Sequence, residues 1–423
     1  MKKKKGKYRL KNSFERKVYF WNALGGIVSA STSVIIIMVI THTTGTYDAG
    51  IFSLGYANAM LFSNIGTLDT RSHQCANAIG RFSFSDYYTF RVVTSFIMIF
   101  GAFIFVNFSN YSAEKSIITI LMSFYCAVIN ISDIFQGNAQ IKGRLDLGGQ
   151  SLAIRGMLNL FIFTLVYIYS QNLILSIIIM TVSAFIWIIT YDKNKILSIE
   201  KPRLNFSLVN LKNLLYESFP LGICLTLQVG IFNIPKYAID RYLVVDMQTI
   251  YSIIFMPAFI VNLFGIMIYR PILVKVSLLW KEGNEKEIKI ILRRKICILI
   301  FITIIITGAG YLWGPSCLSI LYGVTINPYR KELLILLLGG GFTGMINLLY
   351  FVVTVAKRQY LMFGAYLFVF LISCVMSFQM VKKNMLMGAA ESYLLTSIIL
   401  NGLLIIIVYR SLKQLKHEGI IVR

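Results

Sequence analysis

The chain has 423 residues, of which 57% are apolar and 14% are charged, and its mean hydropathy is +0.71. Soluble domains carry about 25% charged residues, so this composition excludes an ordinary soluble protein. Lysine and arginine total 41 against 18 acidic residues. In a membrane protein such an excess sets orientation and does not indicate a nucleic-acid partner. The sequence therefore predicts a polytopic membrane protein.

Apolar runs long enough to cross a bilayer follow one another along the whole chain. They predict an all-α protein with about twelve transmembrane helices. The expected spans are Val18–Thr41, Ala49–Thr70, Val92–Phe108, Ser116–Phe135, Leu152–Tyr169, Leu173–Thr190, Phe219–Tyr242, Ile250–Tyr269, Ile296–Leu312, Leu333–Val355, Tyr360–Val381 and Leu386–Tyr409.

The basic residues between these spans predict the orientation of the chain. Most of them fall before Val18 and in every second connection, whereas the other connections carry few. Basic residues collect in cytoplasmic loops, so we expect both termini to be cytoplasmic. The outer loops are short, which argues against a folded external domain.

The spans fall into two groups of equal number, which suggests a duplicated half. A constant shift of the chain places Ile51–Ser53 on Ile250–Ser252, and parallel repeats of this kind often enclose a substrate site. We therefore expect a first lobe over residues 1–205 and a second over residues 206–423. Amphipathic segments near residues 207–216 and 285–295 predict surface helices that bind anionic membrane lipids, with solvated connectors as the alternative.

Polar residues recur along one face of the seventh expected span. Asn233, Lys236 and Asp240 share this face, and Arg241 follows directly. A charge at the bilayer centre costs about 2.5 to 3.5 kcal/mol, which favours a wet cavity between helices. The alternative places Asp240 and Arg241 at the outer interface.

Other spans carry polar residues that could line the same cavity. Asn58 and Asp69 are spaced to lie on one face of the second span, and Asp133 lies in the fourth, at its cytoplasmic side. Asn347 belongs to a polar stripe in the tenth. Such residues also serve as ordinary packing contacts between membrane helices, and that alternative stays open for each taken alone.

Four arginines predict a cationic vestibule on the cytoplasmic side. Arg71 and Arg270 end the second and eighth spans, and Arg91 and Arg155 lie at a comparable depth. A planar guanidinium suits bidentate contact with phosphate. The alternative is that these arginines only anchor the topology.

Enzyme chemistry has no candidate constellation in the sequence. The chain contains no Walker A, HExxH or GxSxG pattern, and its six cysteines form no CxxC pair. We therefore expect a protein that is not an enzyme and that uses no cofactor or metal.

Four segments resemble the polysaccharide-transporter branch of the MOP flippases, and most closely the Wzx-type and teichoic-acid repeat-unit flippases of Gram-positive bacteria. The likeness runs over nearly the whole chain and is strongest before residue 295. These segments are GRFSFSDYYTFRVVTSF (Gly80–Phe96), DIFQGNAQIKGRLDLGGQSLAIR (Asp133–Arg155), PKYAIDRYL (Pro235–Leu243) and IIFMPAFIVNLFGIMIYRPIL (Ile253–Leu273).

The resemblance implies two six-helix lobes in the bacterial plasma membrane, around a cavity that opens alternately to each side. It implies as cargo an undecaprenyl-diphosphate-linked oligosaccharide or teichoic-acid repeat unit, for capsule or cell-wall synthesis, with polymerase or glycan-assembly proteins as further partners. Lys236, Arg241, Arg270 and Arg71 are the positions that could match the family's cavity cations. Asp240, Asp69 and Asp133 are the candidates for proton or sodium coupling.

Three other functions compete with this hypothesis. A MATE-like cation-coupled exporter of drugs or small molecules shares the superfamily architecture and predicts an acidic cavity. A membrane-embedded glycan polymerase or acyltransferase conflicts with the short outer loops. A lipid scaffold or channel without turnover is the remaining alternative.

Overall fold

The computed structural model describes residues 2–76, 82–196, 200–269 and 273–421, and all regular structure in them is helical. Contacts divide the chain into two compact units, residues 1–226 and 227–423. The boundary falls inside one long helix, α8 (Leu208–Tyr242).

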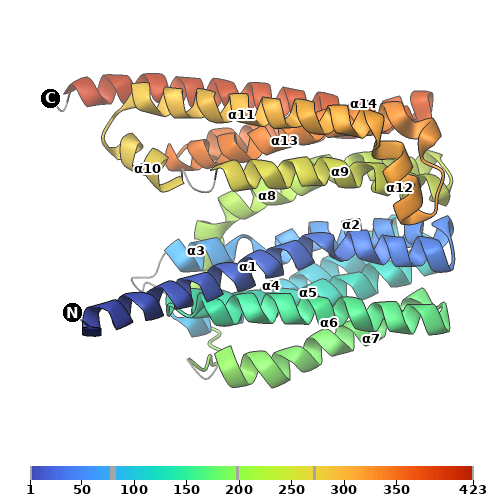
Figure 1. Cartoon of the computed structure of the whole chain (residues 1–423), viewed down its shortest axis with the longest axis horizontal. Helices are drawn as coiled ribbons and strands as arrows, with labels where there is room; N and C mark the ends of the chain where they lie inside the picture. The colour runs from blue at the N-terminus through green and yellow to red at the C-terminus, as the bar shows by residue number, and fades with distance from the viewer. Residues whose placement is uncertain (1, 77–81, 197–199, 270–272, 422–423) are drawn as a thin grey trace. The chain divides into compact units, whose positions relative to one another are not determined.

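In the first unit the helices lie side by side, with α5 in contact with α2, α3, α4, α6 and α7, while α1 packs along α6 (Figure 1). Because α5 touches so many neighbours, its polar residues can meet side chains from several helices. The elements are α1 (Lys2–Thr43), α2 (Thr46–Thr67), α3 (Thr70–Ala76), α4 (Phe84–Phe108), α5 (Ala113–Ile141), α6 (Leu145–Ser170), α7 (Leu173–Trp187), the π-helix η1 (Ile188–Ile196) and the first part of α8 (Leu208–Tyr242).

In the second unit α13 takes the central place, packed against α9, α11 and α14. Its glycines permit this packing, because a Cβ at Gly340 would lie 2.5 Å from the Ala258 carbonyl oxygen of α9. The elements are the rest of α8, α9 (Val245–Tyr269), α10 (Leu273–Lys281), α11 (Glu285–Leu312), α12 (Gly314–Tyr322), the 3-10 turn η3 (Asn327–Tyr329), α13 (Arg330–Val355) and α14 (Gln359–Ile421).

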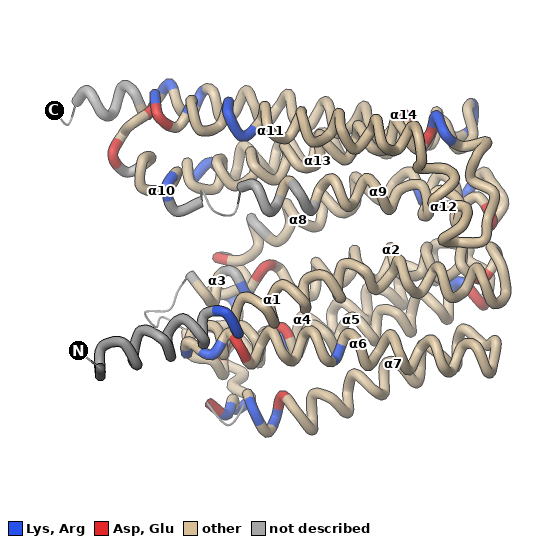
Figure 2. Tube along the Cα trace, in the orientation of Figure 1, with Lys and Arg blue, Asp and Glu red and all other residues tan. Residues whose placement is uncertain are grey.

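The prediction of an all-α polytopic membrane protein is confirmed. Nine helices of the described residues are long and apolar enough to cross a membrane, and the bent pair α11 and α12 adds a tenth. Helix α14 is two helices joined at Met385, where φ is 52° and ψ is −131°. Counting the two helices of α14 separately adds an eleventh. Helix α2 has spanning length but a more polar sequence, and counting it as well would give the expected twelve. Figure 2 shows that charged residues gather at helix ends.

Several helix starts are fixed by local side chains. Ser83 and Asp86 form a capping box at the start of α4, with Ser83 N donating to Asp86 Oδ2 at 2.9 Å. Asn172 caps α7 and Asn284 caps α11 by accepting from backbone N–H groups three residues on. Each cap satisfies a donor that the first helical turn leaves free, so these turns define where the helices enter.

The connection that precedes α8 is attached to the first unit. The side-chain amides of Asn205 and Asn210 both donate to Asp86 Oδ1 at 3.0 Å, and Asn205 N donates to Thr89 Oγ1 at 2.8 Å. Asp86 therefore serves two purposes, since one oxygen caps α4 and the other holds the connection.

The two expected surface helices are the first turns of longer helices. Helix α8 runs from Leu208 without a break, with Leu214 buried in the first unit's core and Leu208 exposed. Helix α11 begins at Glu285 and buries Ile288 and Leu292, while Lys286, Lys289, Arg293 and Arg294 are exposed. Their binding to anionic lipids stays a prediction.

Candidate functional site

A break between α2 and α3 brings Arg71 into the first unit's polar cluster. Helix α2 ends at Thr67, and Leu68 and Asp69 follow with positive φ angles of 42° and 50°. Non-glycine residues adopt this conformation at a cost of about 1 kcal/mol each. The expectation that Asp69 shares a helical face with Asn58 is wrong, because Asp69 lies beyond the helix end.

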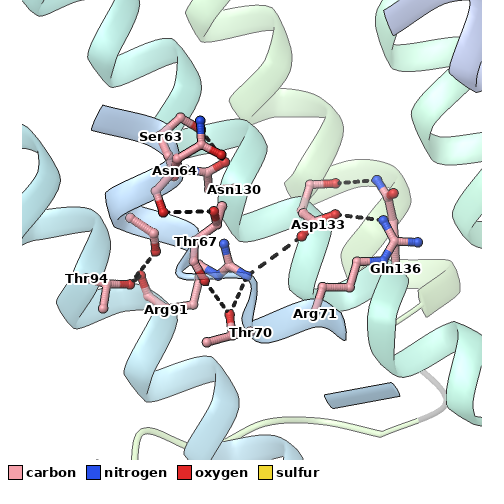
Figure 3. Close-up of polar contacts among 12 residues, drawn as sticks. Ser63, Asn64, Thr67, Thr70, Arg71, Arg91, Thr94, Asn130, Asp133 and Gln136 are labelled. Carbon is pink, nitrogen blue, oxygen red and sulfur yellow. Dashed lines mark hydrogen bonds and ion pairs between the residues drawn. The ribbon is translucent and has the colours of Figure 1, made fainter. Parts of the chain in front are cut away.

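Two arginines converge on one carboxylate in this cluster (Figure 3). Arg71 Nη1 on α3 lies 2.7 Å from Asp133 Oδ1 on α5, and Arg91 Nη2 on α4 lies 3.7 Å from Asp133 Oδ2. Arg91 Nη2 also donates to Thr70 Oγ1 at 2.6 Å, and that hydroxyl donates to the Thr67 carbonyl. Three helices and the α2–α3 break are thereby connected through charged hydrogen bonds, which are the stronger kind.

The two arginines differ in their access to solvent. The Arg91 side chain is fully buried, and its Nε and Nη1 atoms have no hydrogen-bond partner. Arg71 and Asp133 keep 31% and 28% of their side-chain surface exposed. A water-borne anion can therefore reach Arg71, whereas Arg91 holds unused donors behind it.

Polar side chains continue the cluster deeper along α2, α4 and α5 (Figure 3). Ser63 donates to Asn130 Oδ1 at 3.0 Å, and Thr94 donates to the Gly66 carbonyl at 2.6 Å. Hydrogen bonds of this kind tie helices together in the membrane. They give the arginine cluster a rigid support.

Arg155 belongs to a different buried group. It lies on α6 with a buried Nη1 that has no hydrogen-bond partner among the described residues, and Asp192 exerts the strongest attraction on its charge. Asp192 lies on η1 and accepts from Ser132 at 2.6 Å and Ser151 at 2.5 Å. This group joins α5, α6 and η1 in the interior, so Arg155 is not a vestibule residue beside Arg71.

Asn58, another predicted site residue, lies fully buried in α2. Its Nδ2 donates to Thr119 Oγ1 at 3.3 Å and to Tyr111 OH at 3.4 Å. These contacts join α2 to α5 and to the turn before it, as helix-packing residues do.

A histidine that the sequence did not single out lies beside the arginine cluster. His73 on α3 lies 2.9 Å from Tyr87 OH through Nδ1 and 2.9 Å from Glu217 Oε2 through Nε2. The contact joins α3 to α8, 144 positions away in the sequence. No local spacing could have indicated this pair.

The predicted residues of the second unit lie on α8 and α13. Asn233, Lys236 and Asp240 are partly exposed on α8, and Arg241 is exposed near its end. Arg270 lies outside the described residues.

Asn347 belongs to a row of amides in the same unit. Its Nδ2 donates to Asn262 Oδ1 at 2.6 Å, and its Oδ1 accepts from Gln228 Nε2 at 3.3 Å. The row joins α8, α9 and α13. Asn262 and Gln228 were not predicted, because an isolated amide in an apolar run gives no sign of its partner.

Comparison with known proteins places this geometry in context. No protein-family model matches the chain. A capsular polysaccharide biosynthesis protein, CapF of Staphylococcus aureus, is 23% identical over 373 residues, which cover 87% of this chain and 92% of CapF.

Solved structures of MOP transporters resemble the chain over almost its full length. The lipid II flippase MurJ, in an inward closed conformation, matches with a TM-score of 0.66 and 14% identity over 94% of this chain and 91% of MurJ. A multidrug resistance MATE transporter in an inward-facing conformation matches with a TM-score of 0.60 and 13% identity over 92% and 96%. The Vibrio cholerae MATE transporter VcmN matches with a TM-score of 0.61 and 11% identity over 96% and 98%. The chain is therefore a multi-pass membrane protein with the fold of the MOP superfamily of transporters.

Proposed function

We propose that this protein is a flippase for an undecaprenyl-diphosphate-linked oligosaccharide or teichoic-acid repeat unit in the bacterial plasma membrane. The observation that supports this most is the cluster of Arg71, Arg91 and Asp133. It offers guanidinium donors at a solvent-accessible position inside a MOP-type fold. The likeness to a capsule biosynthesis protein over 87% of the chain supports a glycan cargo.

The physical problem is to move a diphosphate and sugars across hydrocarbon. Each polar group that loses water without a new partner costs several kcal/mol, so the protein has to replace the water. Arg71 donates two hydrogen bonds to a pair of phosphate oxygens, in the fork geometry that guanidinium and phosphate share. Lys236 and Asn233 of the second unit stay proposed contacts of the cargo.

Asp133 competes with the cargo for Arg71. A phosphate that binds Arg71 bidentately displaces the Asp133 oxygen now 2.7 Å away. Asp133 is accordingly our first candidate for ion coupling, and Asp69 and Asp240 follow. The direction of transport is from the cytoplasmic to the outer leaflet.

A MATE-like exporter of cationic drugs shares this fold and is the alternative. It needs a carboxylate available to the drug, whereas Asp133 is already paired with two arginines. The arrangement therefore favours an anionic cargo.

Depletion of the protein followed by lipid extraction tests the proposal. We expect an undecaprenyl-diphosphate-linked glycan to accumulate on the cytoplasmic leaflet. Arg71→Gln should fail to reverse this accumulation, and Lys142→Gln, which removes an exposed ion pair with Glu200, should reverse it. Drug sensitivity without lipid accumulation would contradict a flippase and favour the exporter.

A further inference from the structure

An apolar pocket of about 230 Å³, open on one side, lies in the second unit at the junction of α11 and α12. The two helices meet there at a bend of 67°, and Figure 1 shows α12 turning away from α11. The walls of this cavity come from α9, α11, α12 and α13, with Pro257, Leu333 and Leu337 among the lining residues. An apolar cavity of about 150 Å³ holds a benzene ring. This one therefore accommodates about nine carbons of a lipid chain.

Glycines create the space at the bend. A Cβ at Gly310 would lie 2.4 Å from Leu337 Cδ1, and a Cβ at Gly314 would lie 2.8 Å from Leu333 Cδ2. Both glycines line the cavity. The helices approach closely on either side of the bend, and side chains at these two positions would close the gap.

Trp313 lines the cavity, and Tyr311 and Arg330 lie within three residues of its lining residues Gly310 and Leu333. Trp313 and Cys317 line it and are exposed, with Trp313 at 63%. The Arg330 guanidinium lies 5.6 Å from the centre of the Tyr311 ring, one residue from Gly310. Tryptophan, tyrosine and arginine at one level are typical of the boundary between hydrocarbon and headgroups.

We propose that this cavity is a binding site for an anionic phospholipid, with one acyl chain in the cavity and the phosphate at Arg330. Every lining residue belongs to the second unit. The site therefore needs no residue of the first unit, which suits a resident lipid better than a cargo that has to leave. Its role differs from that of the Arg71 cluster and does not depend on the cargo.

Cys317 provides a reporter inside the site, and Cys297, an exposed thiol on α11, provides an internal control. The full-length protein in neutral detergent is treated with N-ethylmaleimide while dioleoyl phosphatidylglycerol or phosphatidylcholine with the same chains is added. Peptide mass spectrometry follows each cysteine. One basic residue near an anionic lipid contributes about fivefold in affinity.

We expect phosphatidylglycerol to slow Cys317 modification at about fivefold lower concentration than phosphatidylcholine, with Cys297 unchanged. Arg330→Gln should abolish the difference, and Lys383→Gln, which removes an exposed charge elsewhere, should keep it. An unchanged Cys297 rate in Arg330→Gln verifies its folding. Equal protection by both lipids, no protection, or stronger protection by undecaprenyl phosphate than by phosphatidylglycerol would each overturn the proposal.

Discussion

Replacing Asp133 by asparagine is the most informative perturbation of the arginine cluster. The exchange keeps the shape of the side chain and removes the charge that Arg71 and Arg91 share at 2.7 and 3.7 Å. Arg91 is fully buried and already has two unpartnered nitrogens, so it cannot turn to water for compensation. Asp69 also attracts the Arg91 charge, but more weakly than Asp133 does.

The loss of unfolding free energy depends on the Arg91 charge, which stays buried without its carboxylate partner. Removing one partner of a buried ion pair costs about 3 to 5 kcal/mol, and the 28% exposure of Asp133 points to the lower end, about 3 kcal/mol. A loss of 1 kcal/mol lowers the midpoint of thermal unfolding by about 2 to 4 °C in a unit of this length. The midpoint of Asp133→Asn should therefore fall by about 6 to 12 °C. Arg71→Gln breaks the same pair from its exposed side and should cost about 1 kcal/mol or less.

Thermal unfolding of the purified protein in detergent measures both variants. The double variant Asp133→Asn with Arg91→Met should regain most of the lost stability, because it removes the buried charge together with its partner. An Asp133→Asn variant as stable as Arg71→Gln, or a double variant less stable than Asp133→Asn, would refute the reasoning.

Three further predictions concern the connection, a thiol and the orientation. Asp86→Ala removes the Asp86 half of the α4 capping box and both amide contacts of the connection; trypsin should cut after Arg203 several-fold faster than in wild type, and an unchanged rate would contradict the anchoring role. Burial raises the pKa of the Cys75 thiol and Arg71 opposes this, so iodoacetamide should modify Cys75 more slowly than a free peptide thiol at pH 7.5, with the rate still rising above pH 9. Arg71→Gln should slow that modification further, and a faster reaction would contradict the sign. Cysteines introduced at Asp48 and Asn384 should react with an impermeant maleimide from outside, and one at Asn284 should not; the reverse pattern would overturn the predicted orientation.

The fold could be predicted because the solvent imposes it. In a lipid environment each crossing segment has to form its backbone hydrogen bonds internally and to be apolar over about 20 residues. Both properties can be recognised from a short stretch of sequence. The same reasoning misjudged the end of the second span. Residues 49–70 read as one polar-striped run, whereas α2 ends at Thr67 and the positive φ angles at Leu68 and Asp69 redirect the chain. Neither residue type demands that conformation.

The candidate site was only partly predictable, because charge partners are chosen by packing across helices. Arg71 and Asp133 were singled out separately, yet their contact joins positions 62 apart in the sequence. Asp192 and Glu217 lie between the expected sixth and seventh spans, yet α5 and α6 enclose Asp192 with two serine hydroxyls and α3 brings His73 to Glu217. A buried carboxylate has to find donors, so the useful sign in such a sequence is a charged residue at the edge of an apolar helix. Its partner can be named only when the neighbouring helix is known.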